Sequence, residues 1–228
     1  MCVEKVRIGA LKEDDLMDKL DFKKQDKALY SGKVGRFDVL DVPAMPFLSI
    51  EGQGEPSGAV YAQAVAALYS VSYKLKFFAK QQLGRDYGVA PLEGLWWADD
   101  MNTFITREKS AWKWRMMIRQ PDWFTGLHVS DARAAVIEKQ GKMKEPKAER
   151  ESLEKLRFGV YDEGLSVQIL HVGSYDDEGP VLKQMHHSFI PENGYKMTGL
   201  HHEIYIGDPR RVAPEKLKTI LRQPVAKV

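Results

Sequence analysis

The chain carries the same order of sequence features twice, and this internal repeat constrains its fold more than any other feature. In each half an extended apolar segment runs into an acidic, Gly-rich turn, at 39–55 and again at 167–179, and each half closes on Arg-Gln-Pro, at 119–121 and 222–224. The alternative is a chance match of two strand ends. A repeated unit folds as two similar halves, and the seam between them is a natural place for a ligand because pockets favour such interfaces.

Composition restricts the class of protein. A chain of 228 residues is long enough for one large domain or two fused small ones, and its five tryptophans and apolar fraction can build a core. The formal net charge is only +2 at pH 7, so no strong electrostatic field attracts nucleic acid or an anionic membrane. We therefore expect neither nucleic acid nor a membrane among its partners.

Cysteine usage and the N-terminal sequence favour a cytoplasmic protein. A lone cysteine, Cys2, excludes a disulfide within the chain and a zinc cluster built on several cysteines. No apolar run of about 7–15 residues follows a basic start, as a signal peptide requires. No stretch approaches the roughly 20 apolar residues that span a bilayer. We expect a soluble, cytoplasmic protein.

The pattern divides the chain into a lead-in segment, 1–35, and a single domain, 36–228. Residues 11–30 are dense in Lys and Asp with few apolar positions, which predicts a solvated segment. The first module, 36–125, follows an order of strand, helix, strand and strand. Its expected elements are strands at 37–42 and 45–50, a helix at 59–83, and strands at 92–98 and 111–119.

A charged connection separates this module from a second one with the same order. Residues 128–158 predict one or two connecting helices, because Ser130-Asp131 resembles an N-cap and Gly141 and Pro146 interrupt the run. The second module, 159–228, repeats the pattern with a strand at 165–172, a helix at 179–189, and strands at 201–206 and 217–222. The fold class is therefore α+β, with two strand–helix–strand–strand modules.

The densest group of polar residues is the segment His201-His202-Glu203-Ile204-Tyr205. Side chains alternate along a strand, so His201, Glu203 and Tyr205 share one face. A carboxylate between apolar walls can serve as a general base or hold a cation. The alternative is a solvent-exposed Glu203 at a sheet edge. Because His201 and His202 point to opposite faces, the segment predicts no metal site.

Aromatic residues from neighbouring elements belong to the same predicted site. Trp96 and Trp97 lie on one expected strand, Trp112 on the next, and Tyr69 on the preceding helix. Such side chains hold planar, apolar or cationic molecules by stacking and cation–π attraction, although most aromatic residues of a domain belong to its core. We select Trp97 and Trp112, with Tyr69 and Tyr205, as ligand-binding residues. Trp96 replaces Trp97 if the strand register shifts by one residue.

Motifs for other chemistries are weak or missing. Gly52-Gln53-Gly54 lacks the GKS/T tail and the full G-x-G-x-x-G spacing, so a turn explains it better than a phosphate loop. No G-x-S-x-G nucleophile elbow occurs. His186 and His187, on an expected helix, predict solvated or capping roles. The sequence indicates no cofactor.

These segments together resemble the GyrI-like small-molecule-binding family. The resemblance extends over residues 36–228 and rests on the segments 51–56, 67–76, 168–178, 201–209 and 214–224. Within the family, the chain is most similar to a stand-alone branch of cyclopropanoid cyclopropyl hydrolases. These enzymes hydrolyse cyclopropane-bearing, DNA-alkylating toxins of the duocarmycin and yatakemycin type.

The resemblance implies two pseudo-twofold modules fused around an antiparallel sheet with a central ligand cleft. It implies that Glu203 is the pocket glutamate, which would polarise or deprotonate the water that attacks the strained ring. Tyr175, in the turn Gly173-Ser174-Tyr175, would border the cleft as a second catalytic residue. His171, within the same resembling segment, is a further candidate for ligand binding.

Three functions stay open on the sequence. The first is a detoxifying hydrolase with Glu203 as general base, aided by Tyr175 or Tyr205. The second is a non-catalytic module that sequesters planar or cationic hydrophobic small molecules through the same carboxylate. The third is a gyrase modulator, which a basic chain fits poorly because DNA mimics are acidic. No helix-turn-helix domain is attached, which disfavours a transcription regulator, and the sequence specifies no oligomeric state.

Overall fold

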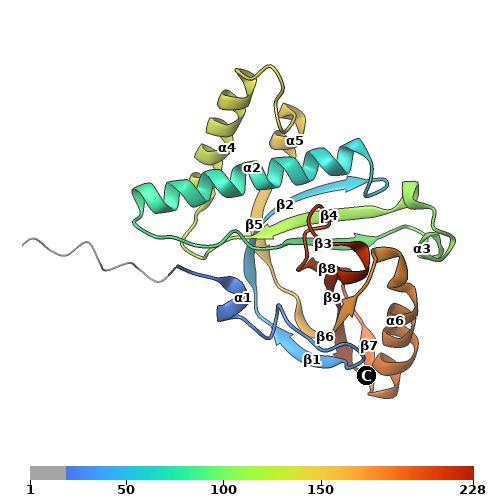
Figure 1. Cartoon of the computed structure of the whole chain (residues 1–228). Helices are drawn as coiled ribbons and strands as arrows, with labels where there is room; N and C mark the ends of the chain where they lie inside the picture. The colour runs from blue at the N-terminus through green and yellow to red at the C-terminus, as the bar shows by residue number, and fades with distance from the viewer. Residues whose placement is uncertain (1–18) are drawn as a thin grey trace, which may run out of the picture.

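One curled antiparallel sheet forms a half-barrel that organises the whole chain (Figure 1). This computed structural model describes residues 19–228. One of the nine strands, β7 (Tyr195–Met197), pairs with β9 but lies outside the main strand order of the sheet. The other eight follow the order β1 (Asp38–Val42), β6 (Gly164–Val172), β9 (Lys218–Lys227), β8 (His201–Tyr205), β3 (Leu92–Trp97), β4 (Lys113–Arg119), β2 (Met45–Gln53) and β5 (Arg157–Tyr161).

The strand order is symmetric about the central pair β3–β8. Outward from this pair, the first half runs β3, β4, β2 and the second half runs β8, β9, β6. The expected α+β class, with two strand–helix–strand–strand modules around an antiparallel sheet, is confirmed. The edges add an exchange that the sequence did not predict. β1, which precedes the first half in the chain, pairs with β6 of the second half. β5, which precedes the second half, pairs with β2 of the first half.

Helices cover one face of each half (Figure 1). The long helix α2 (Ala59–Gln82) lies across β2 and β4, and α4 (Gly126–Gly141) and α5 (Arg150–Lys155) pack on α2. The second half carries α6 (Gly179–Gln184), a π-helical turn η3 (Met185–Phe189) and α7 (Ile190–Glu192). The short elements are α1 (Phe22–Gln25), α3 (Asn102–Thr106) and the 3-10 turns η1 (Lys109–Ala111), η2 (Tyr175–Asp177) and η4 (Pro214–Lys216).

Several boundaries differ from the sequence prediction. The expected helix at 179–189 is α-helical only to Gln184 and continues as the π-helical turn. The region 128–158, expected to form one or two connecting helices, contains α4 and α5 but ends in strand β5, which begins at Arg157. Both differences arise from non-local pairing and packing, which override local propensity.

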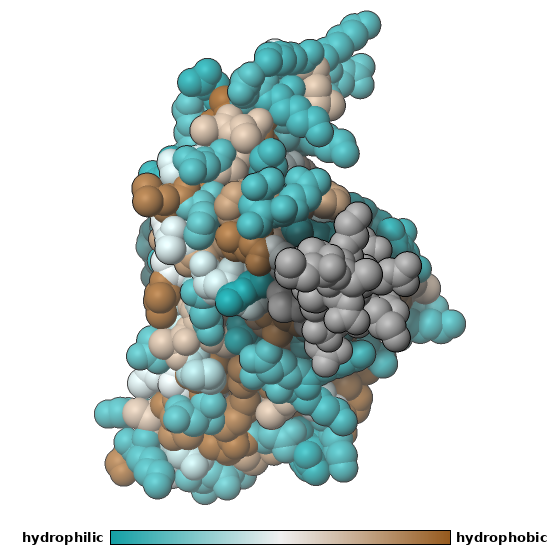
Figure 2. Space-filling view, turned by 90° about the vertical axis from the view of Figure 1, so that its left-hand side faces the viewer, coloured by the Kyte–Doolittle hydropathy of each residue, from teal (hydrophilic) through white to brown (hydrophobic). Residues whose placement is uncertain are grey.

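The core consists of two clusters that follow the two halves. The larger cluster joins α2 to the first-half strands, with Ala64, Leu68, Val71 and Leu75 buried at three- and four-residue steps along the helix. The smaller cluster packs η3 against β6 and β9. The projection formed by α4 and α5 is mainly hydrophilic on the face shown in Figure 2. No helix within residues 19–228 is long and apolar enough to cross a membrane.

The expectation of a solvated segment at 11–30 is wrong for its described part, residues 19–30. Phe22, Leu29 and Tyr30 are buried, and Leu20 pairs with Tyr87 in an isolated bridge. The segment was misread because its few large apolar residues point inward, while its lysines face water. Cys2 lies outside the described residues.

Candidate functional site

The two central strands carry the candidate site on the face that lies between α2 and α6. In the register of β3 and β8, Trp96 stands opposite His201, and Gly94 opposite Glu203. Because opposite residues of an antiparallel pair point to the same side, Trp96, Glu203 and Tyr205 share one face. Alternation along β8 therefore placed Glu203 and Tyr205 correctly relative to each other.

A chain of hydrogen bonds joins these three side chains. The Trp96 indole Nε1 donates to the Tyr205 hydroxyl at 3.0 Å, and that hydroxyl donates to Glu203 Oε2 at 2.7 Å. The Glu203 side chain is only 14% exposed. Burial, followed by the charge of Glu203, raises the pKa of Tyr205 well above its usual value, so the phenol stays a donor. Glu203 is thus held as an acceptor.

An aromatic cluster surrounds this chain, and we use that name for Tyr61, Trp96, Trp112, Tyr175 and Tyr205. Tyr61 on α2 stacks on Trp96 at 6.2 Å between ring centroids, and Trp112 meets Trp96 edge-on at 6.1 Å. Tyr175 meets Tyr205 edge-on at 5.6 Å. Such rings provide flat apolar surfaces for a planar ligand. Tyr61 was not among the ligand-binding residues predicted from the sequence, although its position on the expected helix was clear.

Glu178 is a second carboxyl group beside Glu203 that the sequence reasoning missed. It is 4% exposed, and its Oε1 has no hydrogen-bond partner among the described residues. Burial, followed by the charge of Glu203, raises the pKa of Glu178 to about 10. The available signal was Pro180 in the first turn of α6, which marks a helix start just after Glu178 but does not predict the burial of that residue.

Two histidines extend the site on its other side. His201 Nε2 lies 3.6 Å from Glu203 Oε1, and the His201 ring meets the His186 ring at 5.9 Å between centroids. Burial, followed by the nearby His201, lowers the pKa of His186 to about 4, so His186 is neutral at pH 7. The expectation of a solvated or capping role for His186 is therefore wrong, because η3 turns it inward.

Three of the predicted site residues are not members of the aromatic cluster. Trp97 points to the opposite face of β3 from Trp96. Tyr69 stacks on Tyr73 farther along α2, at 6.3 Å between ring centroids. The His171 Nε2 lies 3.1 Å from the Ser174 carbonyl oxygen, on the strand next to β9.

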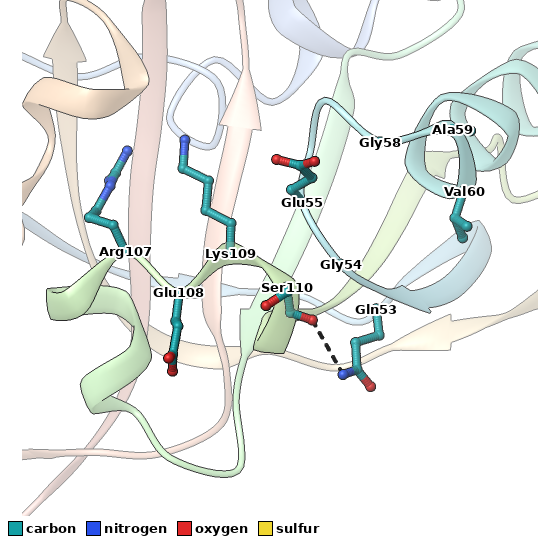
Figure 3. Close-up of a pocket in the computed structure, with 10 residues that line it drawn as sticks. All are labelled: Gln53, Gly54, Glu55, Gly58, Ala59, Val60, Arg107, Glu108, Lys109 and Ser110. Carbon is teal, nitrogen blue, oxygen red and sulfur yellow. Dashed lines mark hydrogen bonds between the residues drawn. The ribbon is translucent and has the colours of Figure 1, made fainter.

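A surface hollow of about 560 Å³ is lined by the turn between β2 and α2 and by the loop before β4, and Glu203 is not among its lining residues (Figure 3). Arg107, Lys109 and Glu55 extend to one side of it, and Glu108 extends to the other. Arg107 and Lys109 lie 5.6 Å and 5.8 Å from the Trp112 ring and form ion pairs with Asp176. These contacts join the loop before β4 to η2 of the second half.

A buried polar network lies on the opposite face of the same strands. His202 Nδ1 lies 2.9 Å from Glu163, and its Nε2 lies 3.0 Å from Glu93. Arg222 donates to Glu163 at 3.0 Å, and the Tyr30 hydroxyl donates to Glu93 at 3.2 Å. Burial alone would lower the pKa of His202, but the two carboxylates raise it to about 9. No three His, Cys, Asp or Glu residues within 19–228 are placed to hold a metal ion.

The chain belongs to the family of the GyrI-like small molecule binding domain, which matches residues 36–226. No curated protein matches it. Its fold is similar to crystal structures from Listeria innocua. An uncharacterized conserved protein is 35% identical with a TM-score of 0.82, and a hydrolase is 34% identical with a TM-score of 0.77. In both comparisons 91% of this chain and 100% of the other chain are covered.

A more distant structure shares the fold alone. The C-terminal domain of EcmrR is 14% identical with a TM-score of 0.53, over 85% of this chain and 98% of that chain.

Proposed function

We propose that this protein is a hydrolase that opens the cyclopropane ring of planar, DNA-alkylating toxins by adding water. The observation that carries the proposal is the position of Glu203, a carboxylate that accepts from Tyr205 inside an aromatic cluster. The 34% identical hydrolase from Listeria innocua, which matches over its whole length, adds support for an enzyme of this general kind.

The proposed chemistry assigns a separate task to each part of the site. The rings of Tyr61 and Trp96 bind the planar skeleton by stacking. Glu203 accepts a proton from the water that attacks the ring carbon, and Tyr205 keeps the carboxylate oriented. Tyr175 supports the ring of Tyr205 from the second half. The strained ring supplies much of the driving force, so one well-placed base is sufficient to begin the reaction.

The test of the proposal is the variant Glu203→Gln, which keeps the shape of the side chain and removes the base. With a cyclopropane-bearing alkylator as substrate, we expect kcat to fall by about 10²- to 10⁴-fold. Binding of an unreactive planar analogue, followed by tryptophan fluorescence, stays unchanged. The matched control is Glu192→Gln, which alters an exposed carboxylate in the same half. Turnover by Glu203→Gln at the wild-type rate contradicts the proposed role.

The second candidate function is sequestration without turnover. A carboxylate beside aromatic faces also suits a cationic hydrophobic ligand, through charge and cation–π attraction. In that case Glu203→Gln weakens the binding of planar cations and leaves neutral planar ligands unaffected. Wild-type protein then releases no ring-opened product from the alkylator. Equal weakening of cationic and neutral ligands excludes this function.

A further inference from the structure

Glu178 is a buried carboxyl group that the reaction described so far does not use. It stands just before α6, is 4% exposed, and has an oxygen without a partner in the described part of the chain. The hydroxyl of Thr219, on β9, is also buried and faces Glu178. A buried polar atom without a partner is costly, so a native protein retains one where it has a task.

The surroundings of Glu178 connect it to the aromatic cluster. Thr219 stands directly opposite Tyr205 in the register of β8 and β9, and Tyr205 donates to Glu203. The groups that act on Glu178 from the elements around it are Glu203 and Tyr205 on β8, Thr219 on β9, Tyr175 on η2 and Arg107 before η1. Glu203, Tyr205 and Tyr175 belong to the candidate site, Thr219 pairs with Tyr205, and Arg107 lies over the Trp112 ring.

The two carboxyl groups differ in what stabilises their charge. Glu203 accepts a hydrogen bond from the Tyr205 hydroxyl. Glu178 has no such donor at Oε1, and the neighbouring negative charge adds to the effect of burial in raising its pKa to about 10. Two neighbouring carboxyl groups in different surroundings, one accepting from a hydroxyl and the other buried without a donor at Oε1, suit the roles of base and acid.

We propose that Glu178 is the general acid of this site and donates its proton to the substrate oxygen that receives the electron pair when the three-membered ring opens. The inference rests on the proposed hydrolase function and names a second catalytic residue for it. The step requires a cyclopropane conjugated with a carbonyl group, whose oxygen receives the electron pair.

The step balances in atoms and electrons. The water oxygen forms a bond to a carbon of the ring while the ring C–C bond breaks. The electron pair of that bond passes through the conjugated system to the carbonyl oxygen, which takes the proton of Glu178. Glu203 takes the proton that leaves the water. Exchange with solvent then returns a proton to Glu178 and removes one from Glu203, and the net reaction is addition of one water.

The experiment compares wild type, Glu178→Gln and Glu203→Gln with a carbonyl-conjugated cyclopropane alkylator across the pH range. Glutamine matches the shape of a protonated glutamate, so we expect Glu178→Gln to fold, as circular dichroism would report. Its kcat falls by about 10²-fold, while an unreactive planar analogue binds as before. Wild-type kcat falls as pH rises toward 10, and this alkaline limb is absent from Glu178→Gln. Glu192→Gln serves as the control with an unchanged profile.

The outcomes separate the two proposals. No ring-opened product from wild type overturns the hydrolase and the acid role together. Product from wild type, with an unchanged rate and pH profile in Glu178→Gln, overturns only the acid role. Loss of analogue binding in Glu178→Gln also overturns it, because the residue then acts in binding. Independently of turnover, infrared spectra of wild type at neutral pH contain a protonated-carboxyl band that Glu178→Gln lacks, and its absence from wild type contradicts the inference.

Discussion

At the scale of single residues, the site depends on a glycine at position 94, which has no side chain. A Cβ at Gly94 would lie 2.9 Å from Trp96 Nε1 and 3.1 Å from the Met116 thioether. The Trp96 indole can therefore turn over the β3 backbone and reach Tyr205 only because this position is glycine. Trp114 lies over Gly52 in the same way, with the indole carbon 2.3 Å from a Cβ built there.

Gly94→Ala should displace Trp96 and weaken the hydrogen bond to Tyr205. We expect a loss of about 1–3 kcal/mol in the free energy of unfolding, the usual cost of overpacking, and weaker binding of planar ligands. Urea unfolding and ligand-dependent tryptophan fluorescence measure the two effects. Gly159→Ala, in strand β5, is the matched control, because a Cβ at Gly159 meets nothing within 4 Å. Equal behaviour of the two variants contradicts the account of Trp96.

Glu178 should make the folded protein less stable at neutral pH. Its pKa is 4.5 in the unfolded chain and about 10 in the folded protein, so between these pH values the folded state holds a proton that the unfolded state has lost. The free energy of unfolding therefore declines as pH rises from 4.5 toward 10. Glu178→Gln should therefore raise the free energy of unfolding at pH 7 by up to about 3 kcal/mol. Thermal unfolding at pH 4 and pH 7 checks this. The gain should disappear at pH 4, and a gain of equal size at both values contradicts it.

At the scale of elements, the central strands separate two kinds of polar group. One face of β3 and β8 carries Glu203 in the aromatic cluster, and the other carries His202 between Glu93 and Glu163. The network ties the two halves to each other, because Glu93 belongs to β3 and His202 to β8. Fixing the register of β8 on one face also fixes the position of Glu203 on the other.

His202→Gln should cost about 3–5 kcal/mol in the free energy of unfolding at pH 6, since it removes the charged partner of Glu93 and leaves Glu163 with Arg222 alone. The folded pKa of His202, about 9, exceeds the unfolded value of 6.5. Its contribution is thus fully present below pH 6.5 and is lost as pH rises through 9. Urea unfolding should give a difference between wild type and variant that shrinks from pH 6 to pH 9. A difference independent of pH contradicts the charged state of His202.

Much of the arrangement of helices and strands around the site could be predicted from the sequence. Periodicity located α2, and alternation along β8 placed Glu203 with Tyr205 and opposite His202. Alternation also separated Trp96 from Trp97, but which of them faces the ligand depends on where α2 packs, and that is a tertiary property. Glu178 was read only as part of an acidic turn, because its burial arises from contacts with β8 and β9 that are distant in sequence.

At the scale of the whole molecule, the two halves depend on segments outside themselves. β1 and β5 exchange between halves, and residues 19–31 close the face that carries the His202 network. Arg222 Nη2 donates to the Leu29 carbonyl oxygen at 2.7 Å, and Gln168 donates to the carbonyl oxygens of Ala28 and Ser31. These exchanges are invisible to local sequence patterns, since each joins residues more than one hundred positions apart or pairs strands of different halves.

Removal of residues 19–31 should expose the network to water and leave Arg222 without one of its acceptors. Compared with a chain that begins at Lys19, a chain that begins at Gly32 should lose about 3 kcal/mol or more in the free energy of unfolding. Urea unfolding of the two chains measures the difference. Equal stability contradicts a structural role for the segment.

The measurement that tests the central claim most directly is a count of product molecules per protein molecule. Purified protein is mixed with a large excess of a cyclopropane-bearing alkylator conjugated to a carbonyl group, and ring-opened water adduct is quantified by mass spectrometry against a protein-free control. The hydrolase account predicts many product molecules for each protein, with the product formed by Glu203→Gln near the control. Tight binding of one ligand per protein with no product above the control contradicts the enzyme and leaves a sequestering protein.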